Sequence, residues 1–139
     1  MDKLPKINRD SSYKRRGGTA QWILLSCGVC KENLALYQKD GPGKLFRLYL
    51  DRLTSTSGER PFSNLGKTAI NALTCNGCQE TIGIPMTYEK DDFPRTALRL
   101  TGAGINKTIL SPRNLPNVPD IDITQTMRSI IKSPDNTPE

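Results

Sequence analysis

The chain contains no histidine, only four cysteines and few aromatic residues: one Trp, three Phe and four Tyr among 139 residues. Without imidazole, a spare thiol or a convincing carboxylate pair, it offers no nucleophile or tuned base, which favours a non-enzymatic role. The longest apolar run covers residues 22–25, too short for a signal peptide or a membrane span. We expect a cytoplasmic protein, because reduced thiols suit a reducing compartment.

The four cysteines form two C-x-x-C pairs, Cys27 with Cys30 and Cys75 with Cys78. A C-x-x-C turn places two thiolates on one side of a tight knuckle, so two knuckles can supply the four corners of a Zn²⁺ tetrahedron. Four thiolates leave no open position for water, which is the pattern of a structural ion. Iron, a dithiol redox site and thiols without metal are the alternatives, and the doubled spacing favours one structural Zn²⁺.

Residues inside the two knuckles support tight turns. Gly28 and Gly77 permit a positive backbone φ angle, Asn76 tolerates it, and we predict that the knuckles use it there. The 44 residues between the pairs exceed the roughly 15 to 20 of a short zinc ribbon. An additional layer of structure is therefore expected between the knuckles.

Strand-forming residues dominate the part of the chain around the cysteines. The expected strands cover residues 20–26, 34–38, 44–53, 69–74, 81–88 and 95–100. Residues 39–43, with two glycines and a proline, form the clearest turn. A helix remains the alternative for residues 44–53, because Leu45, Tyr49 and Leu53 also recur at four-residue steps. We predict a mainly β domain over residues 19–100, built as a small zinc-organised antiparallel sheet.

The segments outside this domain have different compositions. Residues 1–18 carry a net charge of +4 out of the total +6, show no periodicity and are predicted to form a flexible basic arm. Prolines and glycines in residues 101–120 predict a linker. Residues 121–133 predict a short amphipathic helix with Asp122 as N-cap, and residues 134–139 a polar tail. The apolar stripe of that helix consists of Ile123, Met127, Ile130 and Ile131. This stripe docks either on its own sheet or in the groove of a partner.

Two further patterns suggest chemistry but do not support it. Residues 66–68 end like a phosphate-binding loop, yet Pro61 occupies the position where that motif requires glycine. Residues 89–92 group three carboxylates around a lysine, and we interpret them as an exposed turn. Neither pattern predicts a catalytic site.

The paired knuckles resemble two groups of zinc proteins. Zinc ribbons of transcription and translation proteins share the ligand type. The β-tent folds, which include methionine-R-sulfoxide reductases, Yippee proteins and the thalidomide-binding domain of cereblon, share the long separation between knuckles. The resemblance covers residues 22–100 and implies a structural zinc ion. The reductases use a further downstream cysteine, and this chain has none after Cys78.

The excess positive charge suggests a partner. With a pI near 9.3, the chain favours an interaction module for nucleic acid or a nucleic-acid-bound assembly. The candidate contacts are Lys14, Arg15, Arg16, Arg47 and Arg52. Two alternatives stay open: a protein adaptor that docks through residues 121–133, and a small-ligand pocket or enzyme on a β-tent scaffold.

Overall fold

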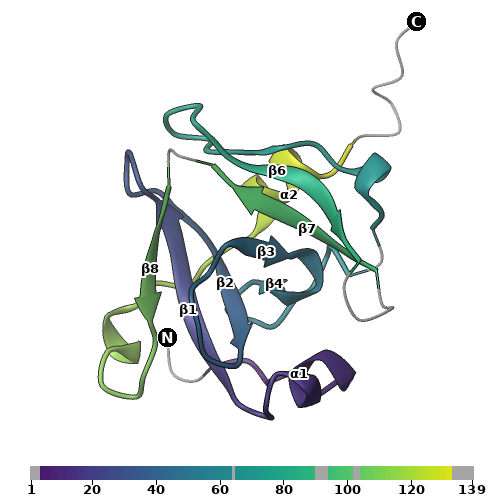
Figure 1. Ribbon diagram of the computed structural model, residues 1–139. Helices are drawn as coiled ribbons and strands as arrows, with labels where there is room; N and C mark the ends of the chain where they lie inside the picture. The colour runs from purple at the N-terminus through teal and green to yellow at the C-terminus, as the bar shows by residue number, and fades with distance from the viewer. Residues whose placement is uncertain (1–3, 64, 90–93, 102–103, 133–139) are drawn as a thin grey trace, which may run out of the picture.

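The computed structural model describes residues 4–63, 65–89, 94–101 and 104–132. Their strands form two four-stranded antiparallel sheets, which confirms the mainly β class. The first sheet has the order β4-β2-β1-β8, with β1 at Ala20–Cys27, β2 at Asn33–Asp40, β4 at Leu53–Thr54 and β8 at Ile105–Ile109. The second has the order β3-β7-β6-β5, with β3 at Arg47–Tyr49, β5 at Leu73–Thr74, β6 at Thr81–Tyr88 and β7 at Arg95–Leu100. Figure 1 shows these sheets as separate layers.

The main core lies between the two sheets. Ile23 and Leu25 from β1 pack in one cluster with Leu48 from β3, Ile82 from β6 and Leu98 from β7. These side chains are all at most 2 % exposed. Fully burying such a side chain stabilises the fold by about 1.5 to 3 kcal/mol. Although the chain has few apolar residues, the facing sides of the two sheets bring them together in one core.

A second core covers the outer face of the first sheet. Trp22 and Leu36 point away from the main core and pack with Leu110, Val118 and Ile121, while Leu4 and Ile7 lie against them. The Trp22 indole Nε1 donates to the Pro5 carbonyl at 3.0 Å. Because β1 is buried on both faces, its sequence is a continuous apolar run and does not alternate.

The N-terminal segment differs from the flexible arm that its composition predicts. It contains helix α1 (Ser11–Arg15), which begins at Asp10, whose side chain accepts a hydrogen bond from the Tyr13 backbone N–H. The Asn8 backbone N–H also donates to the Gln38 side chain at 2.7 Å. Composition misleads here because a few apolar and capping residues are enough to anchor a polar segment on a neighbouring sheet.

The predicted linker is also structured. Residues 105–109 form β8, which pairs with β1 over its whole length, and Leu110, Leu115 and Val118 are buried. A 3-10 turn, η4 (Leu115–Asn117), holds the proline-containing part. Prolines near this strand in the sequence suggested a linker, although β8 itself contains no proline. The prediction of a linker over residues 101–120 was wrong for this stretch.

Residues 44–53 combine three short elements in place of one strand. After β3, residues 50–52 form the 3-10 turn η1 (Leu50–Arg52) and the chain then enters β4 in the other sheet. Leu48 and Leu50 are buried, whereas Phe46 precedes the strand and is 63 % exposed. Of the predicted strand at 69–74, only β5 is a regular strand: η2 (Lys67–Ala69) occupies its start, and Ile70 forms an isolated antiparallel bridge with Ile131.

The C-terminal helix α2 (Thr124–Ile130) is shorter than predicted and packs on its own domain. Ile123 and Ile130 are buried in the main core, and Met127 and Ile131 lie against it. The Thr126 hydroxyl donates to the Leu34 carbonyl at 2.7 Å. The apolar stripe is therefore used inside the fold. None of the helices in the described ranges is long and apolar enough to cross a membrane.

Candidate metal centre and cationic pocket

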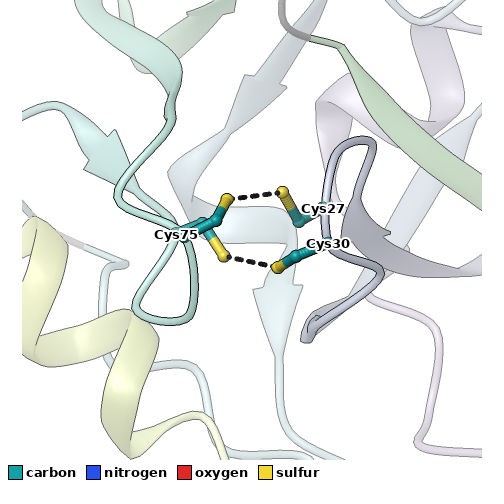
Figure 2. A group of neighbouring side chains, drawn as sticks. Cys27, Cys30 and Cys75 are labelled. Atoms are coloured by element: carbon teal, nitrogen blue, oxygen red, sulfur yellow. Dashed lines mark hydrogen bonds between the residues drawn. The ribbon is translucent and has the colours of Figure 1, made fainter.

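Two hairpin loops bring the four cysteines into one cluster. Cys27 is the last residue of β1 and Cys30 lies in the turn that leads to β2, while Cys75 and Cys78 lie in the loop between β5 and β6. All four Sγ atoms lie within 4.8 Å of one another. Figure 2 shows the loops facing each other through these sulfurs. The chain thus joins its two sheets at a single sulfur cluster.

The sulfur separations fit a tetrahedral metal shell. The Sγ atoms of Cys27 and Cys78 are 3.6 Å apart, and those of Cys30 and Cys75 are 3.4 Å apart. A tetrahedron with metal–sulfur distances of about 2.3 Å has edges of about 3.8 Å. A disulfide would require about 2.05 Å. The cluster is a set of free thiols with the spacing of metal ligands.

Both knuckles share one backbone geometry. The backbone N–H of Cys27 donates to the Glu32 carbonyl at 2.8 Å, and that of Cys75 donates to the Glu80 carbonyl at 2.8 Å. In each knuckle the residue after the second cysteine has a positive φ, 69° at Lys31 and 66° at Gln79. The pattern common to both is C-x-x-C-x-E.

The positive φ angles therefore differ from the prediction that placed them at Gly28, Asn76 and Gly77. Gly77 is needed for a different reason. A Cβ at this position would lie 3.3 Å from the Sγ of Cys30 and 3.8 Å from the Sγ of Cys75. The missing side chain lets the second knuckle approach the first closely.

Hydrogen bonding makes the four thiols unequal. Burial acts to raise the pKa of Cys27, but backbone N–H groups of Cys30 and Val29 outweigh it and lower the pKa to about 7. The Glu80 backbone acts to lower the pKa of Cys78, yet burial and the neighbouring thiols raise it to about 12. Cys27 therefore loses its proton readily, whereas Cys78 resists deprotonation beside it. A divalent cation would offset the negative charge of the thiolates.

The five predicted nucleic-acid contacts separate into two groups. Arg52 is buried, with no exposed side-chain surface, and its guanidinium binds Asp10 at 2.7 Å and Asp40 at 2.8 Å. It cannot contact nucleic acid, so the prediction for Arg52 was wrong. The strand expected over residues 44–53 ends before Arg52, which lies in the 3-10 turn η1, where Leu50 and Arg52 are buried.

The buried Arg52 instead anchors the N-terminal helix. Asp10, at the start of α1, accepts two hydrogen bonds from the Arg52 guanidinium. At the other end of α1, Arg16 lies against Gly41, the residue that follows β2. Gly41 has a φ of 71°, and a Cβ on it would lie 2.6 Å from the Arg16 carbonyl oxygen. The ion pairs and this close backbone contact fix α1 against the end of β2.

Arg15, Arg16 and Arg47 line one cavity, which we name the cationic pocket. It lies between α1, the end of β2, the loop to β3 and the ends of β6 and β7, and its volume is about 310 Å³. Six positively charged residues line it: Arg15, Arg16, Lys39, Lys44, Arg47 and Arg95. The one carboxylate in the lining, Asp40, is bound by Arg52. Lys14, the remaining candidate, is exposed on α1 outside this lining.

One wall of the cationic pocket is a stack of arginines and tyrosines. The Arg47 guanidinium lies 4.2 Å from the centre of the Tyr88 ring, and that of Arg95 lies 3.8 Å from the centre of the Tyr49 ring. The two rings meet edge to face at 5.8 Å. Their partners hold both guanidinium groups in place.

The opposite wall carries a concentrated positive charge. Burial and the nearby Arg16 guanidinium lower the pKa of Lys39. The Lys39 ammonium donates to the Gly41 carbonyl at 2.8 Å. The positive charge of Arg16 disfavours the protonated form of Lys39, so the electrostatic potential at this wall is positive. A bound anion would offset that charge.

Sequence reasoning missed Lys39, Lys44, Arg95 and the two tyrosines of the stack. Lys39 and Lys44 flank the predicted turn at residues 39–43, so clustered charge at a turn was a usable signal. Arg95 had no such signal, because it reaches the pocket only through the pairing of β3 with β7. Of the predicted turn at 89–92, residues 90–92 lie outside the described residues.

Comparison of the chain with family models, with curated proteins and with solved structures found no match.

Proposed function

We propose that this protein is a zinc-stabilised β domain that binds nucleic acid, alone or within an assembly, through the cationic pocket. The observation that carries the proposal is the gathering of six cations from four separate parts of the chain around one cavity with a single, already paired carboxylate. Such a concentration of charge destabilises the free protein unless an anion or counterions offset it.

Zinc is the ion that suits the sulfur cluster best. Thiolates are soft ligands, and a tetrahedral four-sulfur set selects Zn²⁺ or iron. The four cysteines would supply the complete shell, as in other structural sites. Because β2 and β6 both begin just after a knuckle, the ion would hold the starts of one long strand in each sheet.

Phosphate is the anion that the cationic pocket fits. Arginine and lysine supply most contacts to nucleic-acid backbones, and arginine recognises phosphate with two parallel hydrogen bonds. The exposed Phe46 ring in the pocket lining adds a surface on which a base can stack. Charged grooves with stacking rings are typical of single-strand binding. In the β-tent-like arrangement that the knuckles resemble, this would be an interaction surface without a catalytic residue.

Salt dependence tests the nucleic-acid proposal. We expect a fluorescently labelled 12-nucleotide single strand to bind the zinc-loaded chain, with log K falling against log salt at a slope of roughly −0.7 to −1.4, because the pocket has room for one or two phosphates. Lys44→Gln should make that slope shallower, whereas Lys67→Gln, an equal charge change on η2 outside the pocket, should change it less. A flat salt dependence would contradict the proposal.

The metal proposal has a separate test. Native mass spectrometry of gently purified protein should give one zinc ion per chain, and iron or a metal-free mass would contradict it. The adaptor alternative would have to use a surface other than the α2 stripe, since that stripe packs in the main core.

A further inference from the structure

We infer that the cationic pocket is a subsite for one nucleoside monophosphate unit, either free or at the end of a nucleic-acid strand. The inference deepens the proposed function and rests on it. It specifies that the recognised group is a terminal phosphate monoester with its base, and not an internal stretch of backbone.

Charge is the first argument for a terminal phosphate. An internal phosphodiester carries one negative charge, whereas a phosphate monoester carries about 1.5 to 2 near neutral pH. Six cations surround a single cavity of about 310 Å³. A monoester brings up to two negative charges on one group, whereas passing backbone would have to bring two phosphates into the same volume to match it, so a terminal phosphate suits the cavity better.

Available hydrogen-bond donors are the second argument. Arg95 donates from one terminal nitrogen to Asp51 at 2.7 Å. Its Nε is buried and has no hydrogen-bond acceptor among the described residues. A buried donor without an acceptor is unfavourable, so a ligand oxygen that reached it would be bound more tightly. Because Arg95 is fixed on the Tyr49 ring, this donor is already oriented.

Size and shape are the third argument. Ligand cavities in proteins start at about 300 Å³, so this cavity holds one small ligand and not several nucleotides. Charged residues of α1 and β2 line the same cavity as the arginine–tyrosine stack of the second sheet, which suits a ligand with an anionic end and a flat end. Phe46, 63 % exposed in the lining, offers a ring to the base.

The test compares matched ligands on the zinc-loaded full chain. Binding of a labelled 5′-phosphorylated hexanucleotide is competed with the same strand bearing a 5′-hydroxyl, with a nucleoside 5′-monophosphate and with the nucleoside. We expect loss of the terminal phosphate to weaken the strand at least tenfold, and the monophosphate to compete where the nucleoside does not.

Variants locate the effect. Arg47→Gln should reduce the preference for the phosphorylated strand at least fivefold, whereas Arg113→Gln, an equal charge change at an exposed residue outside the pocket lining, should leave it unchanged. Phe46→Ala should weaken the monophosphate about tenfold, since stacking on a ring contributes about 1 to 3 kcal/mol per base. Val29→Ala, an equally exposed apolar truncation at the first knuckle, should have no effect.

The outcomes separate the two proposals. Equal binding of phosphorylated and hydroxyl strands, with affinity that falls as salt rises, would overturn the terminal-phosphate subsite and keep the nucleic-acid function. Direct binding of the free monophosphate, measured by isothermal titration calorimetry, without binding of any strand would support the subsite and overturn the nucleic-acid function. Binding of neither would overturn both.

Discussion

The cysteine cluster and the cationic pocket lie at opposite ends of the same two strands. β2 and β6 begin beside the knuckles at Asn33 and Thr81, and they end in the pocket region at Asp40 and Tyr88. An eight-residue strand is about 23 Å long. At the knuckle end, four thiols converge on one point, where a metal ion would hold the two sheets together. At the pocket end, six positively charged residues surround a cavity that has room for a ligand.

The difference teaches how each end is stabilised. At the knuckle end the sulfurs come from two local repeats with the same hydrogen bonds, so a single ion would satisfy them all. At the pocket end the cations repel one another and are held apart by separate devices: ring stacking, the buried Arg52 and the close contact at Gly41. We therefore expect the loss of one cysteine to unfold the whole chain, whereas substitutions around the pocket should reduce stability or binding gradually.

Loss of a cysteine should have the largest effect. Cys75→Ser should abolish zinc binding and unfold the chain, because structural zinc sites contribute about 10 to 16 kcal/mol and whole domains have only about 5 to 15 kcal/mol of stability. Far-ultraviolet circular dichroism with zinc quantification measures this. Val29→Ser, in the same type of loop but retaining all sulfurs, should stay folded. A Cys75→Ser protein that stays folded without zinc would show that the fold does not depend on a metal ion at the knuckles.

Removal of the buried guanidinium should come next. Arg52→Met leaves Asp40 buried without its cation, which costs about 3 to 5 kcal/mol in free energy of unfolding. Urea unfolding measures the loss, and weaker oligonucleotide binding should accompany it because α1 loses its anchor. The exposed Arg99→Met should change stability by less than about 0.5 kcal/mol. Equal stability of the two variants would remove Arg52 from the support of the pocket.

A methyl group at the turn before the pocket should have an intermediate effect. Gly41→Ala places a Cβ against the Arg16 carbonyl and forces a residue with a side chain to a φ of 71°. We expect a loss of about 2 to 3 kcal/mol together with weaker ligand binding. Gly66→Ala meets open space at a negative φ and should be nearly neutral. Unchanged ligand affinity in Gly41→Ala would show that α1 does not shape the pocket.

Acid should have the smallest effect. Burial acts to raise the pKa of Asp10, but hydrogen bonds from Arg52 and the Tyr13 backbone outweigh it and lower the pKa. Its contribution is therefore present above the ordinary aspartate value of about 3.9 and is lost as the pH falls through the lower folded value. The stability difference between the native chain and Asp10→Asn should be constant from pH 7 to 5 and shrink below about pH 4.

Because Asp10 is 35 % exposed, this difference should be no more than about 1 kcal/mol. Urea midpoints at matched pH measure it, and comparing the two chains cancels any shared effect of acid on the thiols. The difference should also become smaller in an Arg52→Met background. A difference that persisted unchanged to pH 2.5 would exclude Asp10 as a titrating anchor.

Local patterns predicted the elements around the knuckles well. The continuous apolar run that begins at Trp22 and the run that begins at Thr81 both formed strands, because their residue types suit extended backbone and the turns beside them are short. Prediction failed where distant packing decided the outcome. Asp10 and Arg52 looked like separate surface charges, yet they form an ion pair in which the Arg52 guanidinium is buried, and the stretch around Ile105 looked like a linker but pairs with β1.

The sequence by itself determined the candidate metal centre, because a C-x-x-C spacing fixes the two thiols of each knuckle locally and the four cysteines together supply the four ligands of a tetrahedron. Only the tertiary structure decided the cationic pocket. Its charges come from α1, the β2 to β3 region and β7, and their convergence depends on which strands pair and which face turns inward, an outcome of packing over the whole chain that no local spacing records.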